Sequence, residues 1–375
     1  MSFYFEPVWQ GMNAGGYGNC TKDVHAAVLE MDNIMADADK AKALKLRFLG
    51  AGADTNSNAG FADALSVLFY QWQSYGVDGG TGAVRDFCDW ISTDRQSGTT
   101  APAEGWAASK GVDFVLKQWV TWPNWATAVN MNLGSNCKGP AEGSKANRTL
   151  MAHSPLKMEV DGCDLETASS DPDAISWTYQ YCTQWGFFQY SNIGDHQLVS
   201  KYNDQQHQID YCNRQFPDGK SSGLLPAIPK ADETNKHFGG WTIRPSQVFW
   251  SGGQFDPWRT LSPLSDQDFA PKATFTQDIP TCAAPPTASP PSYGDHDDDD
   301  ENDDEDDDAE ERAQRSIVKR GTDALFSFLV PDAEHCFDFR TSVKQGAPAR
   351  QLFNDALTGW LKCFKSGLNS PPTHY

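Results

Sequence analysis

The chain has 375 residues, a length that predicts two packed units or one large domain with an insertion. Hydrophobic residues make up 39% of it and the mean hydropathy is −0.57, which is typical of a water-soluble globular protein. No apolar stretch reaches the ~18 residues of a membrane span, so the composition excludes a membrane protein.

The net charge of −20 is concentrated in one segment. Positions 295–311 hold 14 acidic residues, and subtracting them leaves about −6 for the rest of the chain. Together with the Pro- and Ser-rich stretch before it, this run predicts a disordered insertion at about 283–320. We interpret it as a solvated surface loop; calcium buffering or binding of a basic partner are the alternatives. The folded remainder has no basic aromatic surface, so no nucleic acid partner is expected.

Nine cysteines occur without a C-x-x-C pair, which argues against a zinc site. The triplets N-C-T at Asn19 and N-R-T at Asn147 are acceptors for N-glycosylation and fit a secretory route with several disulfides. The odd count leaves at least one thiol without an internal partner. Nothing before Asn19 has the layout of a secretory signal, so we expect the chain to be incomplete.

Residues 1 to about 240 read as mainly helical with long loops. Apolar residues recur every three or four positions from Asp23 to Met35, where Thr21 is placed to cap the helix. A second helix is expected over 61–72 and a third over 106–129, although Pro123 interrupts the third.

After Gly239 the pattern changes to α/β. Two short β-prone runs, SQVFW at 246–250 and LFSFLV at 325–330, predict buried strands. The segment 347–364 predicts an amphipathic helix that packs on their sheet.

Each predicted strand is followed by a titratable residue, Asp256 after the first and His335 after the second. An Asp and a His in this order complete the triad of an α/β-hydrolase, where the carboxylate orients the imidazole that accepts the serine proton. The alternative is that Asp256 merely begins a turn at Pro257 and His335 is an ordinary, partly exposed histidine. Asp195-His196, and His207 near Asp210, lack ligand spacing, so no metal is expected.

Three segments in order resemble motifs of one enzyme family. VFWSGGQFDPW at 248–258 is similar to N-G-x-x-D-P-W, AEHCFDFR at 333–340 to G-A-H-x-x-D-L-R, and WTYQYCTQWGFFQ at 177–189 to W-x-Y-Q-x-C-T-E-x-G-F-F-Q. These motifs belong to the serine carboxypeptidase family that contains lysosomal prolyl-carboxypeptidase and dipeptidyl peptidase II. Gly252, Ala333 and Gln184 depart from the Asn, Gly and Glu of the patterns.

The resemblance implies a partial α/β-hydrolase sheet with a large, mainly helical cap. We expect an entry segment and first helix at 1–45, a helical cap with long loops at 46–240, and the C-terminal part of the hydrolase core at 241–375. By resemblance, Asp256 is the triad acid and His335 the triad base. Trp258 lines the pocket for the residue before the scissile bond, and Gln184 and Trp185 contact substrate, with the missing charge of Gln184 putting its part in doubt.

The nucleophile is the difficulty, because the family places it upstream of the matched segments. The single G-x-S-x-G match, at 219–223, has Ser221 at its centre. A nucleophile elbow needs a strand before the serine and a helix after it, whereas turn and proline-rich sequence flank Ser221. We therefore expect the N-terminal part with the nucleophile to be missing.

The resulting hypothesis is a serine-type peptidase that cleaves beside proline as an exopeptidase and needs no cofactor. The resemblance implies an extracellular or a vacuolar or lysosomal location. The alternatives are a catalytically dead relative that binds peptides or a partner, and an esterase of the same fold. If strands are missing, an exposed sheet edge is expected, and with it aggregation or dimerisation.

Overall fold

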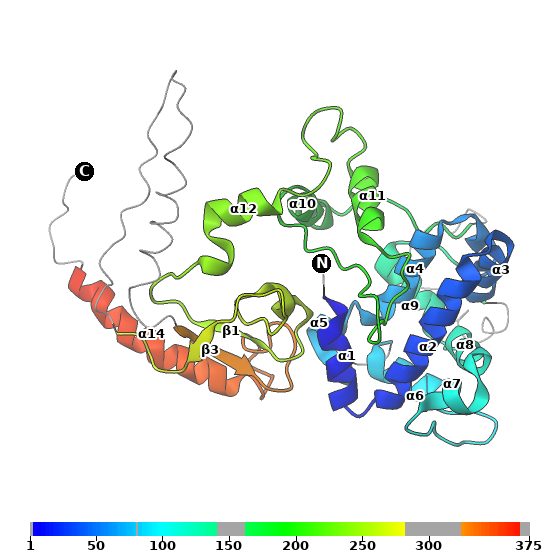
Figure 1. Ribbon diagram of the computed structural model, residues 1–375, viewed down its shortest axis with the longest axis horizontal. Coiled ribbons are helices and arrows are strands. Elements are labelled where there is room, and N and C mark those ends of the chain that lie inside the picture. Colours follow the sequence, from blue (N-terminus) through cyan, green and yellow to red (C-terminus); the bar gives the residue numbers. More distant parts are fainter. Residues whose placement is uncertain (1–2, 80–81, 141–161, 282–323, 368–375) are drawn as a thin grey trace.

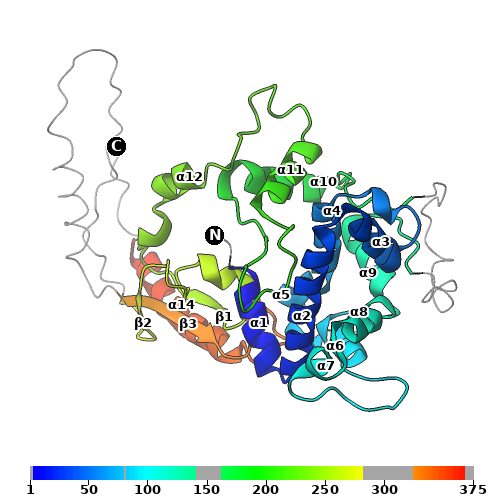
Figure 2. The same cartoon turned by 45° about the vertical axis from the view of Figure 1, so that its right-hand side comes forward.

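The computed structural model describes residues 3–79, 82–140, 162–281 and 324–367, and it arranges them in three groups. In Figure 1, helices α1 to α9 form a helical body on the right, and the strands lie with α14 on the left. Helices α10 to α12 pass above both groups, and we call them the upper helices. The view turned by 45° shows the same three groups (Figure 2).

The bounds of the elements, taken group by group, are as follows. The helical body contains α1 (Phe5–Ala14), α2 (Gly18–Met35), α3 (Ala38–Leu49), α4 (Asn58–Ser66), α5 (Trp72–Tyr75), α6 (Val84–Ile91), α7 (Gly105–Lys110), α8 (Val112–Val120) and α9 (Trp125–Leu133). The upper helices are α10 (Pro172–Gln180), α11 (Gln205–Gln215) and α12 (Ala231–Phe238), with a π-helical turn, η5 (Tyr181–Trp185), after α10. The sheet region contains β1 (Trp250–Gly253), β2 (Thr274–Thr276), β3 (Ala324–Val330) and α14 (Ala347–Gly367).

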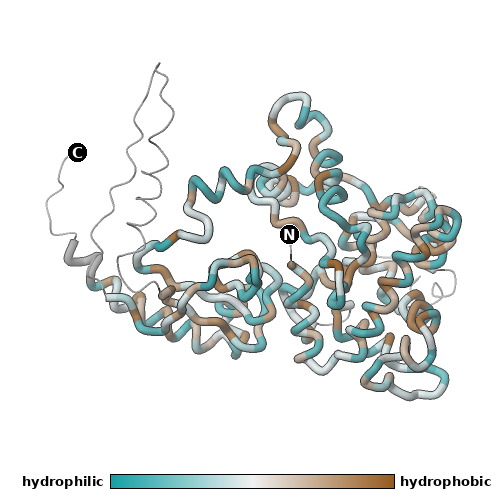
Figure 3. The backbone as a smooth tube through the Cα atoms, viewed as in Figure 1, coloured by the Kyte–Doolittle hydropathy of each residue, from teal (hydrophilic) through white to brown (hydrophobic). Residues whose placement is uncertain are grey.

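The largest hydrophobic core lies in the helical body. Phe48, Trp119 and Trp125 are completely buried at its centre, with ring centroids 6.0–6.2 Å apart in edge-to-face pairs. The hydrophobic stretches of Figure 3 are correspondingly dense in these helices. A disulfide between Cys20 and Cys88 ties α2 to α6. The helical body therefore has a tightly packed core of its own, which makes it a rigid support for the loops that contact it.

The expected helices exist, but their ends differ from the predicted ones. The first helix begins at Gly18, so Thr21 lies inside it and its hydroxyl donates to the Tyr17 carbonyl, which corrects its predicted capping role. The second ends as an α-helix at Ser66. The third is divided into α7, α8 and α9, because Gly111 has φ +85 and Pro123 precedes α9.

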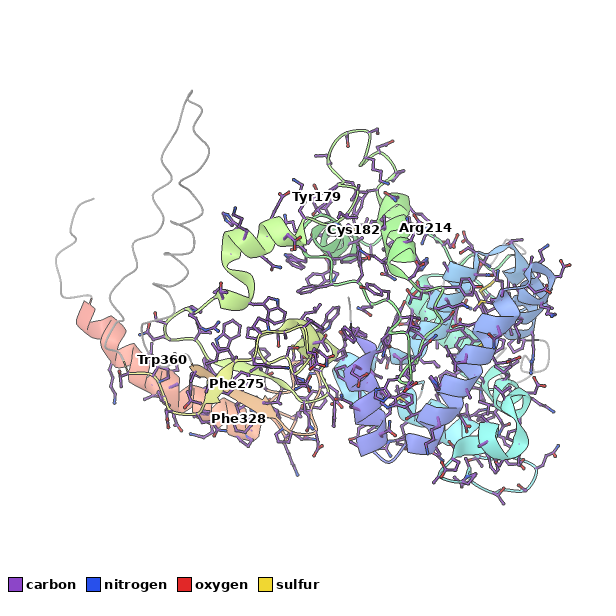
Figure 4. All side chains as sticks on the ribbon, in the orientation of Figure 1. Tyr179, Cys182, Arg214, Phe275, Phe328 and Trp360 are labelled. Atoms are coloured by element: carbon purple, nitrogen blue, oxygen red, sulfur yellow. A yellow bond between two sulfur atoms is a disulfide. The ribbon has the colours of Figure 1, made fainter. Side chains whose placement is uncertain are left out.

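The sheet is parallel and small, with strand order β1-β3-β2 in the described residues. β1 pairs with β3 from Trp250 opposite Ser327 to Gly253 opposite Val330. Trp360 of α14 packs edge-on against Phe326, with ring centroids 5.9 Å apart, so the helix covers one face of the sheet. Figure 4 labels Trp360 beside two strand residues, Phe275 and Phe328, in this region.

The position of the first strand was predicted wrongly. The sequence places it at 246–250, whereas the structure begins it at Trp250 and carries it through two glycines to Gly253. A side chain at Gly253 would collide with the carbonyl oxygens of Ala333 and Glu334, so a glycine permits the close approach of the next loop. On α14, Phe353 and Leu361 are 41% and 47% exposed, so only part of the predicted apolar face is covered.

The chain is thus a mixed helical protein with a three-stranded parallel sheet. Further disulfides join Cys137 to Cys163 and Cys182 to Cys212. The latter connects η5 to α11, and Figure 4 shows Cys182 between Tyr179 and Arg214 in the upper helices. Cys336 is a free thiol, and the side chains of Cys282 and Cys363 lie outside the described residues.

Several expectations stay predictions. The division at residues 45 and 240 and the role of the helices as a cap are not tested by the arrangement of elements. The acidic insertion and Asn147 lie outside the described residues. Asn19 lies in α2, where its side chain accepts from the Cys20 N–H and donates to the Ala101 carbonyl. Within the described residues, no helix combines the length and apolar character needed to cross a membrane.

Candidate active site

The first candidate residue, Asp256, lies in the loop that follows β1. It precedes the short helix η7 (Pro257–Leu261) and caps it, since its Oδ1 accepts a hydrogen bond of 2.8 Å from the backbone N–H of Trp258. Its side chain is only 9% exposed. Because β1 and β3 are parallel neighbours, their carboxyl ends meet at one edge of the sheet, and this loop lies beside the loop that follows β3.

The second candidate residue, His335, lies in that neighbouring loop. Its Nδ1 is 2.9 Å from Oδ2 of Asp256. The imidazole is 42% exposed, in contrast to the buried carboxylate. When Nδ1 carries the proton that it donates to Asp256, Nε2 keeps a free lone pair and can accept a proton from another group.

The loop that carries His335 is held in an uncommon conformation. Asp332 and Cys336 have φ values of +50 and +60, which L-residues rarely adopt and which cost on the order of 1 kcal/mol or more each. The Arg350 guanidinium of α14 stabilises the loop by donating to four backbone carbonyls, those of Phe337 (3.3 Å), Asp338 (3.3 Å), Arg340 (2.8 Å) and Val343 (3.0 Å). The loop is therefore fixed from the helix that covers the sheet.

The surroundings of His335 favour its protonated form. The hydrogen bond to Asp256 raises the pKa of the imidazole, and this effect outweighs the opposing effect of burial. The negative charges of Asp256 and Asp338 raise the pKa further, while Arg340 lowers it. The site thus stabilises the protonated, imidazolium form of His335.

A second carboxyl group, that of Glu334, is buried next to the histidine. Glu334 is 6% exposed, and burial raises its pKa to about 8, with smaller contributions from Asp78 and Asp256. Its side chain lies so close to Gly76 that a side chain at Gly76 would collide with the carboxyl group. Glu334 is therefore largely protonated at neutral pH and adds little negative charge to the site.

An aromatic wall stands beside the Asp–His pair. The Trp258 ring packs edge-on against buried Tyr4 at 4.9 Å and lies 6.0 Å from the ring of Phe187. Phe187 comes from the segment after η5 and is 47% exposed. Burial and the negative charge of Asp256 raise the pKa of Tyr4, so its hydroxyl stays neutral. The wall is apolar, and its first member, Trp258, lies in η7, the short helix that Asp256 caps.

The other predicted substrate residues lie farther along the same aromatic series. The Trp185 ring is 6.4 Å from Phe187 and 5.2 Å from Trp177. The structure therefore connects Trp185 to Trp258 through Phe187. Gln184 is exposed, and its backbone carbonyl accepts a hydrogen bond from the Thr234 hydroxyl. The Gln184 side chain itself makes no hydrogen bond to any of the described residues.

Ser221 lies in an exposed turn that follows α11. Its hydroxyl donates to the carbonyl of Asp218 at 3.0 Å, within the same turn. Figures 1 and 2 both show the loop after α11 at the top of the molecule, on the side of the upper helices away from β1. The local structure lacks the strand and helix that would flank a nucleophile elbow.

Sequence reasoning missed three residues of this site, namely Gln73, Phe187 and Glu334. Phe187 was visible in the third motif, and Glu334 stands where the second motif has alanine, so both left a signal. Gln73 left none, because its hydrogen bonds to Trp258 and His335 join residues that are far apart in the sequence. Elsewhere, His207 Nε2 lies 3.6 Å from Asp63, and the described residues contain no group of three or more His, Cys, Asp or Glu side chains that could hold a metal ion.

Comparison with known proteins gives a consistent result. The profile of the family described as "Serine carboxypeptidase S28" matches residues 3–282. A "Probable extracellular serine carboxypeptidase" of Arthroderma benhamiae is 23% identical over 273 residues, which are 68% of this chain and 34% of that protein. No solved structure matches the chain.

Two further relatives match shorter segments. A "Probable serine protease EDA2" of Arabidopsis thaliana is 31% identical over 90 residues, 23% of this chain and 16% of its own length. The "Thymus-specific serine protease" of Mus musculus is 30% identical over 108 residues, 28% of this chain and 20% of its own length. The chain thus spans about a third or less of the length of these curated relatives.

Proposed function

Because this chain belongs to the serine carboxypeptidase S28 family, we propose that it acts as a serine-type peptidase whose acid and base are Asp256 and His335. The observation that carries the proposal is the 2.9 Å contact between Asp256 Oδ2 and His335 Nδ1 at the ends of two parallel strands. The relatives named as a serine carboxypeptidase and as serine proteases support the same reaction class.

The reaction is acyl transfer to a serine and then to water. Nε2 of His335 removes the proton from a serine hydroxyl as its oxygen attacks the peptide carbonyl, and the same proton then passes to the leaving amine. A water molecule then attacks the acyl-enzyme while His335 accepts its proton, and His335 returns that proton to the serine oxygen as the carboxylic acid product is released. Asp256 holds the imidazole in the required tautomer and stabilises its charged form, in agreement with the raised pKa of His335.

The aromatic wall supports a preference for proline. A proline ring before the scissile bond is compact and apolar, and it can pack against the rings of Trp258 and Phe187, whose centroids lie 6.0 Å apart. We propose cleavage after such a proline near one end of a peptide, as an exopeptidase. In this arrangement Trp185 contacts residues farther from the cleaved bond, and exposed Gln184 has at most a polar contact with the peptide.

The nucleophile in this proposal is a serine other than Ser221. The hydroxyl of Ser221 is bonded within its own turn, and Ser221 is not flanked by a strand and a helix, as a nucleophile elbow requires.

We further propose that the protein is secreted. The name of the Arthroderma benhamiae relative supports this location, and so do the three disulfides within the described residues, because disulfides persist in oxidising compartments.

The test is active-site labelling of the protein isolated from its natural source, with a fluorophosphonate that reacts with activated serines. We expect labelling of a single serine that is not Ser221. Asp256→Asn and His335→Gln should each lower the labelling rate by about 10⁴-fold, whereas Ser221→Ala should leave it unchanged. Peptides with a proline before the terminal bond should compete with the probe.

Each other outcome replaces the proposal with a definite alternative. Labelling at Ser221 would identify a different nucleophile. Labelling that survives His335→Gln would remove the histidine from the mechanism. An unlabelled protein that still binds proline-containing peptides would be a pseudo-peptidase, and turnover of short-chain esters without peptide cleavage would show an esterase.

A further inference from the structure

A closed ring of hydrogen bonds joins the Asp–His pair to the helical body. Asp256 contacts His335 at 2.9 Å through Oδ2 and accepts from the Trp258 backbone N–H at 2.8 Å through Oδ1. The Trp258 indole Nε1 donates to Gln73 Oε1 at 2.7 Å, and the His335 backbone N–H donates to the Gln73 carbonyl at 3.0 Å. Gln73 is the member that touches both loops.

The helix that supplies Gln73 has one turn and is held on both sides. The residue before it, Trp72, is completely buried in the core of the body, and its indole donates to the carbonyl of Phe255 at 3.0 Å. The residue after it, Ser74, offers its carbonyl to the Arg340 guanidinium. Three consecutive residues of α5 therefore bind the two loops, although they lie more than 180 positions away in the sequence.

We infer that Gln73 is a positioning residue, whose side-chain oxygen fixes the Trp258 indole and, through it, the carboxylate that orients His335. The inference rests on the proposed function of the pair. A general base must be held within hydrogen-bonding reach of its partners, and the strained loop around Cys336 needs external contacts to stay in place. Gln73 provides such contacts from a rigid core instead of from either loop.

The bond from Trp258 to Gln73 also has a simple chemical requirement. An indole N–H has one donor and no acceptor, so the partner must offer an oxygen at this position. Only the oxygen of the Gln73 amide is used in this contact. Glutamate can therefore replace glutamine as the acceptor, while methionine keeps a similar length and removes the oxygen.

The experiment uses nuclear magnetic resonance on the full chain with isotope-labelled tryptophan and histidine. The Trp258 indole signal is assigned with Trp258→Phe and the His335 signal with His335→Gln. Gln73→Met should move the Trp258 indole signal to that of a water-bonded indole and lower the pKa of His335 by about half a unit. Gln73→Glu should retain the hydrogen-bonded indole signal.

Gln71→Met is the matched control, because Gln71 is exposed at the start of the same helix. It should leave both signals at their original positions. Trp258→Phe removes the donor from the other end of the bond, so it should lower the His335 pKa equally, and Gln73→Met should add nothing in that background. If Gln73→Met fails to fold, Trp258→Phe and Gln73→Glu still decide the matter.

The inference is overturned if Gln73→Met or Trp258→Phe leaves the His335 pKa unchanged, or if Gln71→Met lowers it as much. It is also overturned if Gln73→Glu loses the indole signal of the bonded state. These signals do not require turnover. A protein that fluorophosphonate does not label would therefore disprove the peptidase while the resonances still report on the role of Gln73.

Discussion

At the scale of single residues, the unusual group is Glu334, a carboxylic acid that is buried beside a histidine. Burial raises its pKa to about 8, far above the usual value near 4.3. Between these two pH values the folded protein keeps the proton, while the unfolded chain releases it. The folded state therefore loses stability from this group as the pH rises from about 4.5 to 8.

We predict that Glu334→Gln, which keeps the shape and removes the titration, flattens this dependence. The free energy of unfolding of the natural protein should fall by roughly 2–4 kcal/mol between pH 5 and pH 8 relative to that of the variant. Urea denaturation at several pH values measures the difference. Asp78→Asn keeps Glu334 and removes a negative charge that raises its pKa, so it should weaken the pH dependence without abolishing it, because burial is the larger cause. Equal slopes for Glu334→Gln and the natural protein would contradict the prediction.

At the scale of elements, one side chain of α14, that of Arg350, donates to four backbone carbonyls of the loop after β3. We predict that Arg350→Met frees the loop, because four carbonyls lose a charged donor whose planar fork reaches them together. Amide hydrogen exchange should accelerate by at least about tenfold in residues 332–343 and stay unchanged in α8.

Arg244→Met is the matched control for this change. Arg244 is exposed, and among the residues that the structure describes it donates only to the nearby carbonyls of Trp241 and Ile243. Its loss should leave exchange in the loop after β3 as it was. Slow exchange in that loop after Arg350→Met would show that two other hydrogen bonds suffice to hold it, namely that of the His335 N–H to the Gln73 carbonyl and that of the Ser251 hydroxyl to the Asp338 carboxylate.

The same elements show what sequence could predict. The carboxyl ends of two parallel strands meet at one edge, so the order of the predicted strands together with the motif resemblance led us to expect Asp256 beside His335, where the structure has them. The end of β1 was missed because Gly252 and Gly253 are typical of a position after a strand. At Gly253 the glycine is required by the approach of the Ala333 carbonyl, a contact between residues that are distant in the sequence. Gln73 was missed for the same reason.

At the scale of the whole molecule, two buried tryptophans of the helical body differ in one respect, and only one of them, Trp72, connects the body to the loops of the Asp–His pair. Trp72 and Trp119 are both completely buried. The indole of Trp72 donates to the Phe255 carbonyl, one residue before Asp256. The indole N–H of Trp119 has no partner among the described residues, and its ring contacts Phe48 and Phe87.

This difference predicts that Trp72→Phe and Trp119→Phe lower the free energy of unfolding by different amounts. Trp72→Phe leaves the Phe255 carbonyl without its donor, while Trp119→Phe removes a buried donor that was already unsatisfied. Both lose similar ring volume, so Trp72→Phe should lower the free energy of unfolding by about 1–2 kcal/mol more than Trp119→Phe does. Only Trp72→Phe should also lower the pKa of His335, because only that bond reaches the loop of its partner. Equal losses of stability, or an unchanged His335 pKa in Trp72→Phe, would mean that the body supports the sheet region by packing alone.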